Sequence, residues 1–362
     1  MKKRLARFSL ILLTVIFLGA SCSLGPQTND KKTSGPSGMF VTTDNGETWN
    51  QISKLMTADG IQNIQNVGVY RVFKDPQDPD ALYWASRGNG LYYSYNKGQA
   101  WQKATGPLEG KFVYNVAIHP EDKCTIFATD GLNVYRSNDC SRSWEQVHKE
   151  DRQRARINTL AFQQSEPYKL FLGKKNGDLL ATSNFGTSWN VIKRFDASIA
   201  EIYTDKQHPK SIFIASQQKG LFRSKDLGKS WVSLRKTMED YAQALDFHRA
   251  VVYPGSSNKI FWASKYGLLV SEDQGDSWEP IELVTSPGSA DIWGLAVNPQ
   301  NDSDIYYTAT VQNRSTFYFS KDGGQSWSTK ELPTGQLPVS LKVHNEDPSI
   351  IYAGFMNPTK GN

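Results

Sequence analysis

The chain has few of the residues that build metal centres and nucleophilic active sites. Its 362 residues include three cysteines and five histidines, and the histidines are scattered along the chain without the spacing of metal ligands. Two cysteines without nearby histidine partners make a poor metal site. No Ser/His/Asp arrangement, glycine-rich phosphate loop or Arg-Ile-Pro segment occurs. We therefore expect neither a metal ion nor a cofactor, and we assign no catalytic residue.

A strong excess of one charge is also missing. The formal net charge is +5, but four basic residues and no acidic ones fall within residues 1–21. The remainder of the chain is close to neutral, near +1. A general nucleic-acid binder carries a much larger basic excess. Nucleic acid is therefore not an expected partner.

Long hydrophobic runs are absent as well. The apolar residues 10–18 are too few for a stable membrane span, and basic residues precede them. This pattern predicts a signal peptide over residues 1–21. The next motif, Gly19-Ala20-Ser21-Cys22, resembles a bacterial lipobox, which implies a lipid anchor on Cys22 and an extracytoplasmic, membrane-attached protein. Secretion with cleavage nearby is the alternative. The polar residues 22–38 read as a flexible tether.

One eight-residue pattern, in contrast, occurs seven times. Each copy begins with Ser or Thr, has Asp or Asn in third place and ends in Trp, and the closing tryptophans are 52, 43, 45, 42, 47 and 49 residues apart. This period is typical of a repeat architecture with one four-stranded blade per repeat. The third and last residues of the copies are Asp44 and Trp49, Asn96 and Trp101, Asp139 and Trp144, Asn184 and Trp189, Asp226 and Trp231, Asp273 and Trp278, and Asp322 and Trp327.

Each octet lies between two runs rich in aromatic and β-branched residues, which predicts a β-hairpin. In such a turn the Asp or Asn side chain accepts backbone hydrogen bonds and the Gly takes a positive φ. The Trp starts the returning strand and packs under the turn. We therefore expect a structural role for all seven octets, not a catalytic one.

The two ends of the chain complete the repeat count. One strand-like run, residues 39–43, precedes the first octet, and two such runs, residues 339–343 and 350–354, follow the last. Six whole repeats and two half repeats make seven blades. The sequence thus predicts an all-β, seven-bladed propeller over residues 39–362, closed by pairing of N- and C-terminal strands so that no sheet edge stays open.

The octets resemble the Asp-box, or BNR repeat, with the consensus S-x-D-x-G-x-T-W. Asn96 and Asn184 depart from it in place of Asp, and Ser141 in place of Gly. Propellers with this repeat include sialidases, xyloglucanase-type glycoside hydrolases, the sortilin family and a lipoprotein family of photosystem II assembly factors. With its seven blades, short loops and leader, the chain is most similar to the last group.

Cys124 and Cys140 fall in one repeat. Cys124 starts the second strand and Cys140 lies in the octet turn. Because the second and third strands are antiparallel, the two thiols are expected to be neighbours, and an oxidising compartment favours their disulfide. The same octet lacks its Gly, so the bridge is expected to compensate for a poor turn.

The innermost strands supply the candidate binding site. Their alignment places aromatic and charged residues at equivalent positions facing the channel, which a repeated packing core does not require. We predict a partly basic, aromatic mouth that binds an acidic or extended polypeptide. Ordinary wall residues and solvated loops are the alternative. The candidates are Tyr70, Arg71, Tyr114, Asn115, Glu201, His248, Arg249 and Trp293, with cations from the loops between second and third strands: Arg87, Lys174, Lys175, Lys219, Lys265, Arg314 and Lys360.

Two functions remain open on this sequence. The first is a non-catalytic, membrane-anchored binding scaffold that assists the assembly or stability of a membrane or envelope complex. The second is a glycan-binding protein or a glycoside hydrolase of sialidase-like kind, which needs two carboxylates flanking the scissile bond. Asp246, Asp291 and Glu201 lie near the starts of innermost strands and are the candidates for such a pair.

Overall fold

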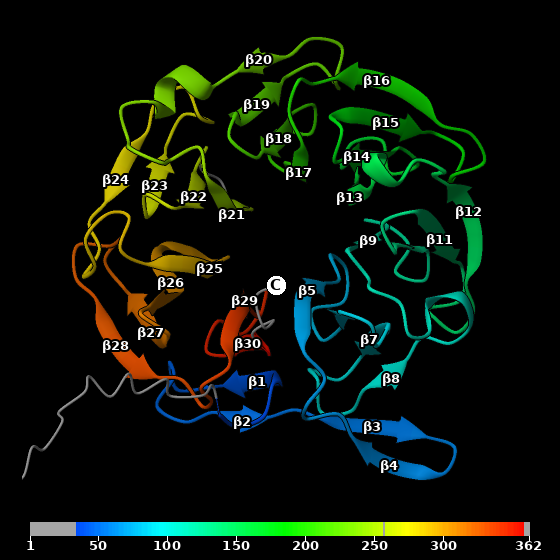
Figure 1. Cartoon of the computed structure of the whole chain (residues 1–362), viewed down its shortest axis with the longest axis horizontal. Helices are drawn as coiled ribbons and strands as arrows, with labels where there is room; N and C mark the ends of the chain where they lie inside the picture. Colours follow the sequence, from blue (N-terminus) through cyan, green and yellow to red (C-terminus); the bar gives the residue numbers. More distant parts are fainter. Residues whose placement is uncertain (1–33, 256–257, 358–362) are drawn as a thin grey trace, which may run out of the picture. The chain divides into compact units, whose positions relative to one another are not determined.

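The computed structural model describes residues 34–255 and 258–357, so Cys22, the leader and Lys360 lie outside it. In this part of the chain, seven sheets of four antiparallel strands stand in a ring around an open centre (Figure 1). The prediction of an all-β, seven-bladed propeller is confirmed. No helix among the described residues has the length and apolar character needed to cross a membrane.

One blade is built from both ends of the chain. Its order is β2-β1-β30-β29, with β1 at Gly38–Thr42, β2 at Asn50–Gln51, β29 at Leu337–Val343 and β30 at Ile351–Met356. Met39 pairs with Gly354 in antiparallel register, and Figure 1 shows the blue and red strands side by side. The predicted closure of the ring is therefore confirmed.

The other six blades are continuous in sequence. From the channel outward they are β5 (Val69–Lys74), β6 (Leu82–Ser86), β7 (Leu91–Ser94), β8 (Gln102–Lys103); β9 (Asn115–Ile118), β10 (Ile126–Thr129), β11 (Asn133–Ser137), β12 (Glu145–Lys149); β13 (Ile157–Phe162), β14 (Leu170–Lys174), β15 (Asp178–Thr182), β16 (Asn190–Arg194); β17 (Ile199–Thr204), β18 (Ile212–Ser216), β19 (Gly220–Ser224), β20 (Val232–Ser233); β21 (Phe247–Val252), β22 (Ile260–Ser264), β23 (Leu268–Ser271), β24 (Glu279–Ile281); and β25 (Asp291–Asn298), β26 (Asn301–Val311), β27 (Arg314–Ser320), β28 (Ser328–Glu331).

Among the described residues, a small hairpin outside the blades adds two strands that the repeat count did not predict. Strands β3 (Lys54–Thr57) and β4 (Gly60–Asn63) pair with each other and project from the rim (Figure 1). They take up the extra residues of the longest interval between octets, the 52 residues that separate Trp49 from Trp101. Short 3₁₀ helices, η1 (Gly106–Leu108), η2 (Gln153–Ala155) and η3 (Arg235–Met238), lie in other connections between blades.

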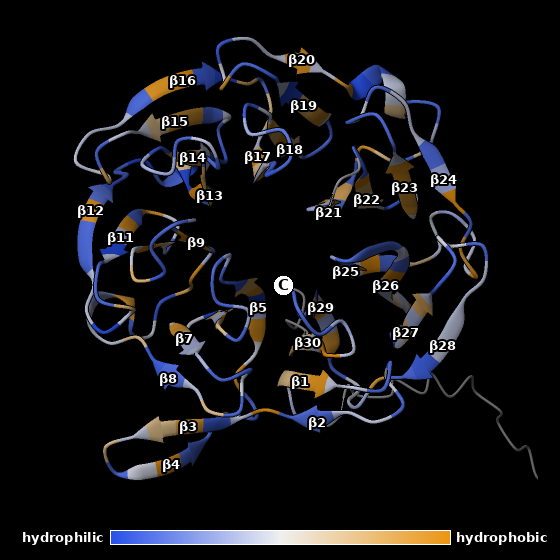
Figure 2. Ribbon diagram, turned by 180° about the vertical axis from the view of Figure 1, so that it is seen from behind, coloured by the Kyte–Doolittle hydropathy of each residue, from blue (hydrophilic) through white to orange (hydrophobic). Residues whose placement is uncertain are grey.

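The core lies between neighbouring blades, and the second strand of each blade forms its centre. Each of these strands carries a buried aromatic residue directly after a buried Leu or Ile: Tyr83, Phe127, Phe171, Phe213, Phe261, Tyr306 and Tyr352. Sheets packed face to face bury both faces of such central strands. The outermost strands are more polar, and Figure 2 shows β2, β8 and β12 as largely hydrophilic. Within each blade, the second strand is thus largely buried and the outermost strand is largely exposed.

The octet turns are closed by their own side chains. In the fifth octet the Ser224 hydroxyl donates to Asp226 Oδ1 at 2.8 Å and accepts the Gly228 N–H at 2.8 Å. The Ser230 N–H donates to the same carboxylate at 2.8 Å. Leu227 and Gly228 both have a positive φ, 62° and 88°. The predicted turn chemistry is present, and the residue before the Gly also adopts the left-handed conformation.

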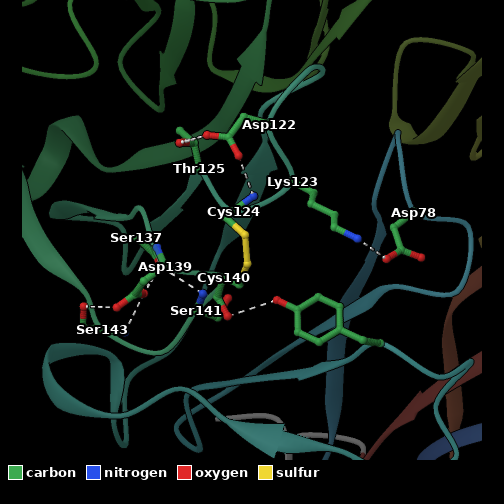
Figure 3. Close-up of a disulfide and its surroundings, with 11 residues drawn as sticks. Asp78, Asp122, Lys123, Cys124, Thr125, Ser137, Asp139, Cys140, Ser141 and Ser143 are labelled. Carbon is green, nitrogen blue, oxygen red and sulfur yellow. Dashed lines mark hydrogen bonds and ion pairs between the residues drawn. A yellow bond between two sulfur atoms is a disulfide. The ribbon is translucent and has the colours of Figure 1, made fainter.

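The third octet has a disulfide beside its turn, which confirms the predicted Cys124–Cys140 pair (Figure 3). Ser141 stands at the Gly position with a φ of 67°, a conformation that disfavours a side chain. The neighbouring Tyr95 hydroxyl donates to the Cys140 carbonyl at 3.0 Å. The bridge therefore holds the turn whose backbone is the least favourable of the seven.

Candidate functional site in the central channel

A β-bulge near the start of the innermost strand recurs in six of the seven blades. In β5 the pairing with β6 skips Tyr70, and in β21 and β25 it skips His248 and Trp293. A bulge leaves one residue out of the ladder and redirects its side chain. The skipped residues in the remaining three strands are Asn158, Ala200 and Val339. The repeated bulge therefore produces the inner ring of side chains aligned from the sequence.

These side chains line a cavity of about 500 Å³ at one end of the channel, which we call the mouth. Five cations line it, whereas no Asp or Glu among residues 34–255 and 258–357 does. A cavity of this volume is within the usual range for ligand sites. The cations are Arg71, Arg87, Arg156, Lys175 and Arg249.

One side of the mouth is an aromatic cluster covered by arginines. The rings of Phe112 and Tyr114 stack with centroids 4.0 Å apart, and Tyr70 meets Phe112 edge-on at 4.7 Å. The Arg87 guanidinium lies 5.4 Å from the Tyr70 ring, and that of Arg156 lies 4.7 Å from the Tyr114 ring. Such cation–π contacts hold an arginine in place while its N–H groups stay available to a ligand.

A second aromatic platform lies on strands β21 and β25. The rings of His248 and Trp293 stack with centroids 4.2 Å apart, and Trp293 is 41% exposed. Arg249 Nη2 donates to the Val339 carbonyl at 3.3 Å. Burial lowers the pKa of His248, so the imidazole is neutral at pH 7. The platform therefore offers a flat, uncharged surface in a basic mouth.

The floor of the mouth is an ion-pair network across the channel. Glu201 Oε1 lies 3.1 Å from Arg71 Nη1, and its Oε2 lies 3.8 Å from Arg249 Nη1. The Tyr203 hydroxyl donates to Glu201 Oε2 at 2.8 Å. Burial by itself raises the pKa of Glu201, but the two arginines outweigh it and hold the pKa below its usual value. Glu201 is thus a permanent anion between two cations.

Below this floor lies a narrow space of about 50 Å³, the inner cavity. Arg71 and Arg249 line it from above, and Lys342 and Ser340 line it from β29. Burial, then the nearby Arg249, lowers the pKa of Lys342 to about 8. Burial and Lys342 likewise lower the pKa of Lys74 to about 7. Among the described residues that line the inner cavity, three cations, Arg71, Arg249 and Lys342, therefore accompany one carboxylate, Glu201.

The structure brings most of the candidate residues together. Tyr70, Arg71, Arg87, Tyr114, His248, Arg249 and Trp293 line the mouth, and Glu201 lies in the inner cavity. Asn115 does not reach either cavity, because it is buried in the channel wall, where its side-chain oxygen accepts the Leu160 N–H at 3.1 Å.

Several loop cations are neutralised by partners. Lys174 is buried against Glu150, Lys219 pairs with Asp196 and Lys265 with Asp291. Arg314 is exposed but does not line the mouth. Asp246 and Asp291, the proposed carboxylates, line neither cavity. No group of three or more His, Cys, Asp or Glu in the described ranges is placed to hold a metal.

Arg156, Phe112 and Lys342 belong to the site but were not singled out from the sequence. Arg156 and Phe112 precede the aligned rings by two residues, in the connections that enter the innermost strands. Lys342 follows the second ring position of β29 by two residues, so its side chain lies on the same face. Extending the ring alignment by two residues in both directions would have found all three.

Two family models match this chain. The model described as Sortilin, neurotensin receptor 3 matches residues 37–154 and 89–194, and the BNR/Asp-box repeat model matches residues 318–329. The second match covers the last octet, and all seven octets form the same kind of turn in a seven-bladed ring. The structure is a seven-bladed β-propeller that carries Asp-box repeats.

Among the known proteins similar to this propeller, xyloglucanases form one group and YCF48 proteins another. A xyloglucanase of a Paenibacillus species is 26% identical over 299 residues, which are 72% of this chain and 26% of that enzyme. The solved GH74 xyloglucanase from Xanthomonas campestris has a TM-score of 0.63 at 16% identity, covering 80% of this chain and 51% of that one. The structure "YCF48 bound to D1 peptide" has a TM-score of 0.60 at 12% identity, covering 80% of this chain and 94% of that one.

The two groups differ in how much of each known protein the Asp-box propeller spans. It spans about a quarter of the Paenibacillus enzyme and about half of the Xanthomonas structure, but nearly all of the YCF48 chain. At these identities the structural likeness establishes the propeller fold alone. The proposed function therefore rests on the residues that line the channel.

Proposed function

We propose that this Asp-box propeller is a non-catalytic binding scaffold whose mouth holds an extended polypeptide segment carrying carboxylates. The observation behind the proposal is the composition of the mouth, where five cations lie beside two aromatic platforms and no carboxylate from the described part of the chain lines the cavity. Arginine and aromatic side chains are the usual anchors of protein interfaces. The likeness in length and fold to the structure "YCF48 bound to D1 peptide" supports the proposal of a peptide-binding mouth.

The same composition weighs against glycoside hydrolysis in this channel. Hydrolysis of a glycosidic bond needs two carboxyl groups on opposite sides of that bond. Asp291 is paired with Lys265, and Glu201 is held between two arginines below the mouth. Glycan binding without hydrolysis keeps one supporting observation, the exposed Trp293 stacked on His248, because a flat exposed ring suits a sugar face.

We propose further that the propeller works at a membrane surface outside the cytoplasm, where it assists assembly or stability of a membrane or envelope complex. The lipobox-like motif ending at Cys22 supports a lipid anchor, and the disulfide fits an oxidising compartment. Replacement of Cys22 by Ser should release the protein from the membrane fraction and abolish metabolic labelling with palmitate. If the Cys22→Ser variant stayed in the membrane fraction and still incorporated palmitate, the proposed anchor would be contradicted.

The peptide proposal is tested with the two arginines that cover the aromatic cluster. Binding of a fluorescent Glu/Ala peptide is followed by anisotropy for wild type and for the double variant Arg87→Glu, Arg156→Glu. Loss of two charge-assisted contacts should weaken binding by about a hundredfold. The matched control is Arg194→Glu, since Arg194 is exposed on the outer strand β16. If the double variant bound the peptide as tightly as wild type, the proposal would be refuted. If the protein instead bound oligosaccharides in a way that depended on Trp293, the glycan alternative would be favoured.

A further inference from the structure

The inner cavity has more positive charge than its own residues can neutralise. Arg71, Arg249 and Lys342 line it together with one carboxylate, Glu201. Glu201 is fully engaged by the two arginines and by the Tyr203 hydroxyl. Lys342 Nζ has no hydrogen-bond or ion-pair partner within residues 34–255 and 258–357. Lys342 is partly exposed, and an unpaired ammonium group with limited access to water is costly unless an anion accompanies it.

The shape of the inner cavity limits what that anion can be. Its volume of about 50 Å³ accommodates one small ion or one carboxylate group, not a sugar ring. Leu295, Leu341 and Val72 provide apolar walls, and Ser340 lines the same space. An apolar wall with a few converging donors strengthens each charge interaction because water is excluded. Arg249, Lys342 and Ser340 supply those donors.

We infer that the inner cavity is a binding site for one small monovalent anion, a halide or a carboxylate, held by Lys342 with Arg71 and Arg249. The site shares Arg71 and Arg249 with the mouth but needs no bound polypeptide. The carboxylate can arrive as a free ion or as the end of a chain that enters from the mouth, and both offer the same chemistry to Lys342. Occupation by one monovalent anion reduces the excess of positive charge in the inner cavity.

The protonation of the lysine supports this assignment. With the cavity empty, burial and Arg249 bring the pKa of Lys342 down to about 8, and a bound anion raises it again. Anion binding therefore weakens as the pH rises through the titration of Lys342. The charged or titratable groups facing it are Arg71 and Lys74 on β5, Glu201 and Tyr203 on β17, Arg249 on β21 and Tyr352 on β30.

Chloride alone is the probe for the test. The ³⁵Cl NMR line width of a chloride solution is measured with wild-type protein, with Lys342→Met, and with Lys193→Met, a control at an exposed lysine of β16. Removal of one charge-assisted contact should weaken chloride binding by about tenfold in Lys342→Met and leave it unchanged in Lys193→Met. Equal broadening by wild type and Lys342→Met would overturn the inference, as would no broadening by wild type.

Competition then identifies the source of the anion. Displacement of chloride by acetate but not by a Glu/Ala peptide supports a free-ion site, and displacement by both supports a carboxylate of a bound chain. If Lys342→Met does not fold, the wild-type pH profile decides: broadening should fall steeply above pH 8, and a flat profile to pH 10 would overturn the inference. Peptide binding to Arg87 and Arg156 is measured separately, so either proposal can fail without the other.

Discussion

Arg71 and Glu201, 130 residues apart in sequence, form an ion pair across the channel with 3.1 Å between Nη1 and Oε1. Both residues directly follow the bulge of their innermost strand, so the same local feature in two blades aims both side chains inward. The pair closes the floor of the mouth and joins strands that share no backbone hydrogen bond. A change in the charge of this floor should therefore also change the stability of the ring.

Replacement of Glu201 by Gln should destabilise the propeller. Arg71 and Arg249 would then face each other without a carboxylate between them, and loss of a buried partner costs about 2–4 kcal/mol, reduced here by water in the channel. Urea unfolding measures the change. The control is Glu47→Gln, an exposed partner of Lys330, with an expected cost below about 1 kcal/mol. Equal costs in the two variants would show that the network does not stabilise the ring.

The octet aspartates should make stability dependent on acid pH. Asp226 accepts hydrogen bonds from the Ser230 hydroxyl, the Ser230 backbone N–H and the Ser224 hydroxyl. These bonds hold the pKa of Asp226 at about 2, below its unfolded value of about 3.9. A depressed pKa gives stability that is present above pH 4 and is lost as the pH falls toward 2.

Asp226→Asn should therefore lose less of its Tm between pH 4 and pH 2 than wild type does, since Asn has no proton to gain. Asn184 shows that the turn accepts this residue, because its side-chain amide donates to the Ser188 hydroxyl at 2.9 Å. Asp59→Asn, at the exposed tip of the β3–β4 hairpin, is the control. Parallel Tm curves for Asp226→Asn and wild type would contradict the role of this carboxylate.

Ser141→Gly should stabilise the protein by about 1 kcal/mol. Ser141 has a φ of 67°, and its buried hydroxyl has no hydrogen-bond partner in the described part of the chain. A non-glycine residue in this conformation costs about 1–2 kcal/mol. The reverse change, Gly228→Ser, should destabilise by a similar amount, since Gly228 has a φ of 88°. Chemical denaturation compares the two, and a loss of stability in Ser141→Gly would contradict the prediction.

Lys174 and Lys175 are adjacent in sequence but should respond very differently to replacement by Met. Lys174 is buried and pairs with Glu150, whose pKa is lowered to about 2 because Arg152 and Lys174 outweigh its burial. Lys175 is exposed at the mouth.

Lys174→Met should cost about 3 kcal/mol, because it leaves a buried carboxylate with Arg152 alone, whereas Lys175→Met should change stability by less than about 0.5 kcal/mol. Thermal unfolding distinguishes the two. The difference should shrink as the pH falls from about 4.5 toward 2, because Glu150 takes up a proton over this range. Similar costs for both variants at pH 7 would show that the ion pair contributes nothing.

Most of the fold was predictable because its determinants are local. The hydrogen bonds that the Ser or Thr and the Asp or Asn side chains make within each octet turn join residues at most four positions apart, so eight residues specify a turn wherever they occur. The regular interval between turns then gives the blade size, and the incomplete first and last repeats give the closure of the ring. The β3–β4 hairpin was missed because its residues carry no repeat pattern.

The candidate site was only partly predictable. Alignment of repeats placed Tyr70, His248 and Trp293 in one ring, and the structure brings them to the mouth. Alignment could not tell that Asn115 stays in the wall or that Lys174 is neutralised by Glu150. Both outcomes depend on which side chain a neighbouring blade presents, and the sequence of one repeat does not contain that information.

The sequence by itself thus determined the number of blades and their turns, because each octet forms its turn hydrogen bonds within a short stretch of chain, and the incomplete repeats at the two ends indicated the closure of the ring. Only the tertiary structure decided which charges meet in the channel. Arg71, Glu201, Arg249 and Lys342 come from four blades and interact because ring closure and the bulges point them at one axis. Electrostatic interactions depend on distance in space, and for residues up to 271 positions apart only the folded ring sets that distance.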